Sequence, residues 1–101
     1  MGEQYSHLIQ MLAGCFHQDW LLEAKNADEV LRRYVSDATG AVRKAVVSDI
    51  NELLREPNRD VDEFVETSGC YYVPSVEGMS TRQWLAKISS VLDPKRVVTH
   101  E

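Results

Sequence analysis

Apolar residues recur at the 3.6-residue spacing of an amphipathic helix along most of this chain. The first stripe predicts a helix that begins at about Ser6 and has Gly14 near its end. Residues 16–24 hold a compact apolar group beside acidic residues, which favours a short helical turn or a buried corner. The first stripe consists of Tyr5, Leu8, Ile9, Leu12 and Phe16, and the apolar group of Trp20, Leu21 and Leu22.

Three later stripes follow residue pairs with the spacing of a capping box. In such a pair the first side chain accepts a hydrogen bond from the backbone N–H three residues on, and the second side chain bonds back. Thr39-Gly40 marks a break before the longest stripe, and Pro57 ends that helix at Glu56. The pairs are Asn26 with Glu29, Asp60 with Glu63, and Ser80 with Gln83.

These stripes predict the buried face of each helix. The expected core positions are Val30, Leu31, Tyr34 and Val35; Val42, Ala45, Val46, Ile50, Leu53 and Leu54; Val61, Phe64 and Val65; and Trp84, Leu85, Ile88, Val91 and Leu92.

Residues 70–78 lack a helical period and combine β-formers with Pro and Gly, so we expect an extended loop or at most a short strand. Gly69 is expected to end the preceding helix, and Pro94 the last one. The predicted fold is all-α: a single domain over residues 1–101, with four to five short helices and one extended loop before the last helix. Its core spans about residues 5–92, and residues 95–101 are expected to be a frayed tail.

Length and composition limit the function classes. A chain of 101 residues can bury one modest core, which leaves little room for a large active site. No apolar run approaches a membrane span, and the first residues lack the pattern of a secretory signal, so we expect a cytoplasmic protein with no membrane partner. Two cysteines are too few for a disulfide framework.

The net charge of −5 is concentrated in the middle of the chain. Residues 47–79 contain eight acids and two bases, which disfavours direct nucleic-acid binding and favours a basic protein partner. A solvated face that keeps the protein soluble is the simpler alternative. We predict a docking surface formed by Asp49, Glu52, Glu56, Asp60, Asp62, Glu63 and Glu66.

Cys15, His17 and Asp19 raise the question of thiol or metal chemistry. Alternate residues on a helix point about 200° apart and cannot converge on one atom. A structural zinc site needs four ligands, and no paired spacing supplies them. We therefore expect no catalytic residue, no metal and no cofactor, with Cys15 in the core and with His17 and Asp19 bonded to backbone at a helix corner.

Tyr71 and Tyr72 lie in the predicted extended loop, where neighbouring side chains point to opposite sides. One should be buried and the other exposed. We assign a structural role to Tyr71. We add Tyr72 to the docking surface, because tyrosine is enriched at interface cores.

Two blocks of the sequence resemble the bacterial contact-dependent growth inhibition immunity proteins of the CdiI type. In that family a Phe-His-Gln-Asp-Trp block, here residues 16–20, lies near the N-terminus. A Gly-Cys-Tyr-Tyr stretch, here residues 69–72, precedes a Ser-x-x-x-Trp-Leu helix, here residues 80–85. Cys15 departs from this pattern, in which we expect an aromatic residue. The motif residues we interpret as structural are Phe16, His17, Asp19, Trp20, Cys70, Tyr71 and Trp84.

The resemblance implies a helical, non-enzymatic protein that binds the C-terminal toxin domain of a cognate exoprotein. Many such toxins are nucleases, so the acidic surface would occlude a basic substrate cleft. Two alternatives remain open: a small acidic adaptor or regulatory subunit of a basic host protein, and an enzyme that uses Cys15 and His17. The adaptor would have no toxin gene beside it, and the enzyme requires a reactive Cys15 thiol.

Overall fold

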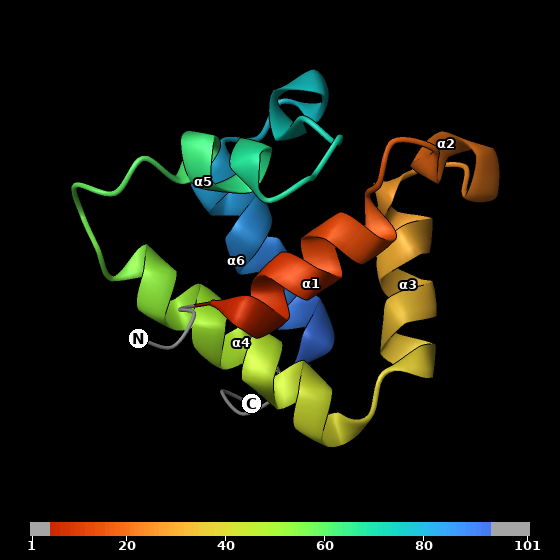
Figure 1. Ribbon diagram of the computed structural model, residues 1–101, viewed down its shortest axis with the longest axis horizontal. Coiled ribbons are helices and arrows are strands. Elements are labelled where there is room, and N and C mark those ends of the chain that lie inside the picture. Colours follow the sequence, from red (N-terminus) through yellow and green to blue (C-terminus); the bar gives the residue numbers. More distant parts are fainter. Residues whose placement is uncertain (1–4, 94–101) are drawn as a thin grey trace.

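The computed structural model describes residues 5–93, and every regular element within that range is helical (Figure 1). The predicted all-α fold is therefore confirmed. It has one α-helix more than the four to five expected, because the short helical turn that was one of two possibilities for residues 16–24 forms at residues 20–23. The predicted tail lies outside the described residues. The elements are α1 (Ser6–Cys15), α2 (Trp20–Glu23), α3 (Ala27–Asp37), α4 (Gly40–Leu54), α5 (Val61–Thr67), the 3-10 helix η1 (Pro74–Glu77) and α6 (Thr81–Leu92).

Four helices begin at a side chain that accepts a hydrogen bond from the backbone N–H three residues later. These capping residues are Asn26, Thr39, Asp60 and Ser80. The reciprocal bond of a complete capping box forms only at α6, where the Gln83 side chain accepts from the Ser80 N–H at 2.9 Å. Each cap satisfies an N–H that would otherwise lack a partner, so the three predicted starts are confirmed and Thr39 adds a fourth.

The core forms where α1 and α6 pack against α4 (Figure 1). α1 crosses the middle of the molecule, while α2 and α3 lie at one end and α5 lies near the start of α6. The stripes predicted for these helices supply the fully buried side chains. Among them are Leu8, Leu12, Val46, Ile50, Leu53, Leu85 and Ile88.

Four aromatic side chains from three distant segments form one cluster in this core. Trp84 on α6 lies 5.3 Å from Phe16 and 4.8 Å from Tyr72, measured between ring centroids. Phe16 also lies 5.4 Å from Trp20, with the rings edge to face. Aromatic pairs in such arrangements add to the stabilisation from burial. Phe16, Trp20 and Trp84 are therefore all buried in the core.

Some apolar positions differ from the predicted stripes. Leu21 and Leu22 are exposed by 65% and 84%, because only Trp20 of that group turns inward from the single turn of α2. Val42 is 37% exposed near the start of α4, whereas Val47, outside the predicted stripe, is buried. A helix packed between two partners needs a wider apolar face than one stripe provides.

Residues 70–78 form the predicted loop, with η1 at its end in place of a strand. Gly69 before the loop and Gly78 after η1 have φ angles of +93° and +79°, a backbone region that glycine adopts without a steric penalty. The prediction that Gly69 ends a helix is confirmed. In the described part of the chain, no helix has the length and apolar character needed to cross a membrane.

Arg82, near the start of α6, bonds to backbone carbonyls at the end of α4 and in the segment between α4 and α5. Its guanidinium donates to the carbonyl oxygens of Leu54 at 3.2 Å, Glu56 at 2.7 Å and Arg59 at 3.4 Å. The Leu54 carbonyl belongs to the last turn of α4, whose oxygens have no partner within the helix. A cation also interacts favourably with the negative end of a helix dipole. Arg82 therefore fixes the segment between α4 and α5.

Candidate functional site

Two of the seven predicted docking acids are engaged in holding α1. Asp49 on α4 accepts a hydrogen bond from the Leu8 N–H at 3.1 Å. The residue before α1, Tyr5, has a φ angle of +63° and provides no side-chain cap. Asp49 thus supplies the missing N-terminal cap of α1 from another helix, and its half-buried carboxylate is structural.

Glu56, which follows α4, also holds the start of α1. The Tyr5 hydroxyl donates to the Glu56 carboxylate, which also pairs with Arg59 at 3.3 Å. The hydrogen bond from Tyr5 is the main reason that the pKa of Glu56 lies below its usual value, and it likewise raises the pKa of Tyr5. Glu56 is half-buried, so it contributes less to an exposed surface than its sequence position suggests.

Four of the remaining five acids lie at or on α5, and all five are exposed. Asp60 caps the helix through the Glu63 N–H at 3.0 Å, and the carboxylate of Asp62 accepts a hydrogen bond from the Thr81 hydroxyl at the start of α6. Glu63 and Glu66 make no side-chain hydrogen bond or ion pair to other residues within 5–93. We call Asp62, Glu63 and Glu66 the α5 acidic face.

Glu52 is separate from this face. It lies on α4 and borders a different hollow, which is also lined by Lys44, Arg55 and Asp93. Two bases and two acids thus line this hollow, so negative charge does not dominate there. The structure therefore divides the seven predicted acids, so that the α5 acidic face is the part with uncompensated negative charge.

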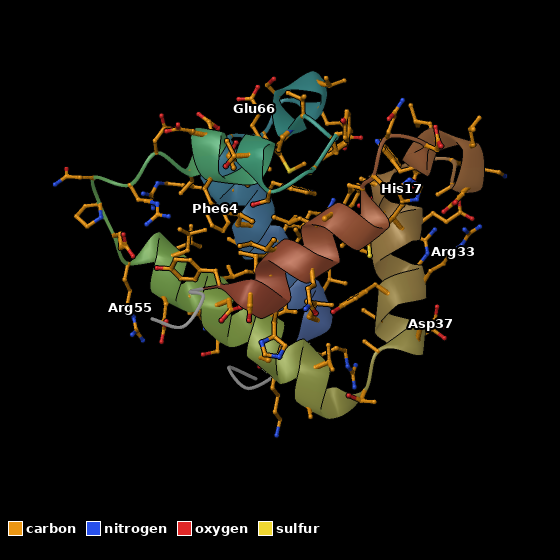
Figure 2. The ribbon with its side chains drawn as sticks, viewed as in Figure 1. His17, Arg33, Asp37, Arg55, Phe64 and Glu66 are labelled. Atoms are coloured by element: carbon orange, nitrogen blue, oxygen red, sulfur yellow. The ribbon has the colours of Figure 1, made fainter. Side chains whose placement is uncertain are left out.

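A hollow of about 420 Å³ opens between α5 and the loop that follows it. Asp62 and Glu66 lie on one side, and Tyr72, Val73 and Ser75 on the other. Figure 2 shows Glu66 at this end of the molecule. Among the described residues that line this α5 hollow there are two carboxylates and no lysine or arginine. The hollow can therefore receive a cationic or hydrogen-bond-donating group.

The assignment of the two loop tyrosines was wrong. Tyr72 is 6% exposed and lies in the aromatic cluster, whereas Tyr71 is 60% exposed. The Tyr71 N–H donates to the Phe16 carbonyl at 2.8 Å, which fixes the backbone so that the next side chain points into the core. Tyr71, not Tyr72, is available to a partner.

The remaining motif residues are placed as follows. Cys70 is buried, and its thiol donates to the Tyr72 carbonyl at 3.6 Å. His17 Nδ1 accepts from the Asp19 N–H at 3.1 Å, and Nε2 lies 3.2 Å from the Glu23 carboxylate. Asp19 is exposed and takes part through its backbone alone, since α2 receives no side-chain cap from it. The backbone role predicted for His17 is confirmed, but the Asp19 side chain does not share it.

Both cysteines are poorly suited to nucleophilic chemistry. Burial, with a smaller contribution from Asp37, raises the pKa of Cys15 to about 11, and burial also raises the pKa of Cys70 to about 11. The thiolate is the nucleophile, so both groups are almost entirely unreactive thiols at neutral pH.

We predict that neither cysteine reacts readily with iodoacetamide in the folded protein at pH 8. A pKa of about 11 leaves roughly one thiolate in a thousand at that pH. The rate for each thiol should be at least tenfold below that of the urea-unfolded chain, as measured by mass spectrometry over time. Rapid modification of Cys15, slowed by His17→Ala, would instead support the enzyme hypothesis.

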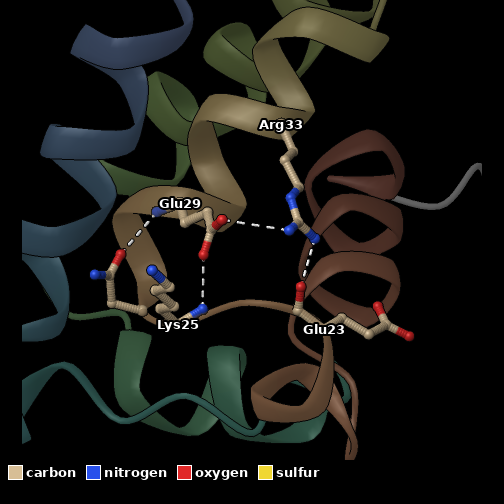
Figure 3. Close-up of polar contacts among 5 residues, drawn as sticks. Glu23, Lys25, Glu29 and Arg33 are labelled. Carbon is tan, nitrogen blue, oxygen red and sulfur yellow. Dashed lines mark hydrogen bonds and ion pairs between the residues drawn. The ribbon is translucent and has the colours of Figure 1, made fainter.

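A polar network between α2 and α3 was not predicted from the sequence (Figure 3). Glu29 accepts hydrogen bonds from the Lys25 N–H at 2.7 Å and from Arg33 at 3.3 Å. Arg33 also donates to the Glu23 carbonyl at 2.5 Å, at the end of α2. The Lys25 N–H is the largest cause of the lowered pKa of Glu29. The i, i+4 spacing of Glu29 and Arg33 was a usable signal, but the bond to α2 depends on tertiary structure.

Two of three comparisons with known proteins found a match, and these two agree with each other. A family model described as "CdiI immunity protein" matches residues 4–92. A chain in the crystal structure of the CdiA-CT/CdiI complex from Y. kristensenii 33638 is 29% identical, with a TM-score of 0.82. The alignment covers 90% of the present chain and 100% of that chain. A search of curated proteins gave no match.

Proposed function

Because this chain belongs to the CdiI immunity protein family, we propose that it binds and neutralises the C-terminal toxin domain of a cognate contact-dependent growth inhibition exoprotein. The match over residues 4–92 carries this proposal, and the similarity to a chain of a CdiA-CT/CdiI complex supports it. Inhibition then arises from binding alone, without catalysis by this chain.

The α5 acidic face and the α5 hollow are the proposed contact for a basic region of the toxin. A nuclease binds phosphate groups through lysine and arginine, so its substrate cleft would complement these carboxylates. The side chains of Glu63 and Glu66 make no hydrogen bond or ion pair within 5–93, so a partner can approach their carboxylates without breaking an existing contact. We propose a nuclease toxin whose cleft is covered, in an interface of about 1,600 Å² in total.

The first test is co-expression with the toxin domain encoded directly upstream of this chain's gene. We expect rescued growth and a complex that copurifies. Loss of both would contradict the proposed function and leave the adaptor hypothesis. A catalytically inactive toxin domain then permits binding measurements on purified proteins.

We predict that Glu63→Lys/Glu66→Lys slows association with that toxin domain about tenfold or more at low salt, with a flatter salt dependence. Charged surfaces steer encounter, and ions screen the effect. Stopped-flow kinetics at several salt concentrations would measure it.

The matched control is Asp37→Lys/Glu52→Lys, which changes the net charge equally at exposed positions on α3 and α4. Its association rate should stay near that of the wild type. If both double variants slow association to the same extent, net charge matters and the α5 acidic face does not.

A further inference from the structure

Another hollow, of about 320 Å³, opens between α2 and η1. It is lined by four of the six large hydrophobic side chains that are exposed within the described residues. These are Leu21, Tyr71, Val73 and Val76, exposed by 65%, 60%, 55% and 80%, and we call them the Tyr71 patch. Single exposed hydrophobic residues are common, but several around one hollow are typical of an interaction surface.

Both walls of this hollow are held in place. On the α2 side, Arg33 donates to the Glu23 carbonyl and thereby fixes the end of α2 against α3 (Figure 3). On the loop side, the Tyr71 N–H donates to the Phe16 carbonyl at 2.8 Å, and the Val76 N–H to the Val73 carbonyl at 3.1 Å. A partner therefore meets an ordered surface, which lowers the entropic cost of binding.

The charge beside the patch indicates which partner fits. Tyr72 and Val73 line both this hollow and the α5 hollow, so the patch is continuous with the carboxylates of Asp62 and Glu66. Glu77 lines the patch hollow itself, with Lys25 as its one basic lining residue. An apolar group surrounded by basic residues complements this surface better than an apolar group surrounded by neutral or acidic residues.

Tyr72 contributes an unusual polar atom beneath the patch. Its hydroxyl is buried and has no hydrogen bond of acceptable geometry to another residue of the described chain. Burial, followed by the nearby Glu77 carboxylate, raises its pKa to about 12. The phenol is therefore neutral at physiological pH. Buried polar atoms without partners are rare in folded proteins, so this hydroxyl beneath the patch is an exception.

We propose that the Tyr71 patch is the apolar anchor for the toxin domain, and this inference rests on the proposed function. An aliphatic or aromatic side chain of the toxin occupies the hollow between α2 and η1, and a neighbouring lysine or arginine pairs with Glu77. The α5 acidic face then governs the association rate, while the buried apolar contact governs the dissociation rate.

The test compares Tyr71→Ala and Val76→Ser with the control Val42→Ser, which makes the same valine substitution at an exposed position on α4. Affinity for the inactive toxin domain is measured by surface plasmon resonance. We expect Tyr71→Ala to raise Kd at least tenfold, and Val76→Ser severalfold, mainly through faster dissociation. The control should stay within twofold of the wild type, and all three should keep the wild-type circular dichroism spectrum.

Each other outcome has a defined meaning. If the wild type binds the toxin domain and Tyr71→Ala binds equally well, the anchor is wrong and the proposed function stands. If the wild type does not bind it, both are wrong. If the wild type sediments as a dimer that Tyr71→Ala converts to a monomer, the patch joins two copies of this chain and the toxin assignment is overturned.

Discussion

Replacing Trp84 by alanine is expected to lower the free energy of unfolding by about 3–5 kcal/mol. Trp84 has no exposed surface and lies at the centre of the aromatic cluster, against Phe16 and Tyr72. Truncation removes its burial and leaves a cavity between α1, α6 and the loop. Since small domains are stable by only about 5–15 kcal/mol, the variant should be close to unfolding. Urea unfolding followed by circular dichroism would measure the loss.

Trp84→Phe provides a milder version of the same change, because it keeps an aromatic ring and leaves a smaller cavity. Its free energy of unfolding should lie between that of the wild type and that of Trp84→Ala. Leu22→Ala is the control, since that side chain is 84% exposed and should change stability by less than about 0.5 kcal/mol. Equal effects of Trp84→Ala and Leu22→Ala would show that the aromatic cluster is not part of the stable core.

Replacing Arg82 by methionine is expected to destabilise the protein by about 2–3 kcal/mol. Methionine retains an aliphatic stem but leaves the carbonyls of Leu54 and Glu56 without the guanidinium that now bonds to them. Hydrogen bonds from a charged donor are stronger than neutral ones, and the cation also stabilises the end of α4. Thermal unfolding of the purified variant would measure the effect.

Arg55→Met is the matched control for Arg82→Met. Arg55 is exposed at the C-terminal end of α4, and its side chain donates no hydrogen bond within residues 5–93. Its replacement should have less than about 0.5 kcal/mol of effect. Arg82→Lys should recover only part of the loss, because an ammonium group cannot reproduce the fork of the guanidinium. Complete rescue by lysine would mean that charge alone is sufficient.

Local information in the sequence accounts for most of the helices. The caps at Asn26, Asp60 and Ser80 were predicted because each involves residues three apart. Gly69 was predicted because glycine commonly follows the last residue of a helix, and its positive φ angle agrees with that role. The stripes were correct at the fully buried positions and less reliable at helix ends such as Val42, where packing partners differ. Periodicity indicates which residues share a face, but not how wide the buried face is.

The candidate site was predicted only in part. Counting charges identified the acidic segment, but the sequence does not show that Asp49 holds the fold whereas Glu66 stays exposed. Asp49 bonds to the start of α1, 41 residues away in the sequence, whereas Glu66 borders an open hollow. The Tyr71 patch was missed because Leu21 and Val76 come to line one hollow only in the tertiary structure.

The sequence by itself determined the helical class, the capped helix starts, the core stripes and the family, because all of these depend on residue types at short, regular spacings. Tertiary structure alone decided which carboxylates hold the fold and which remain free, and which of Tyr71 and Tyr72 faces solvent. Alternation along an extended backbone requires the two tyrosines to point to opposite sides, but only the position of the core relative to the loop selects the buried one.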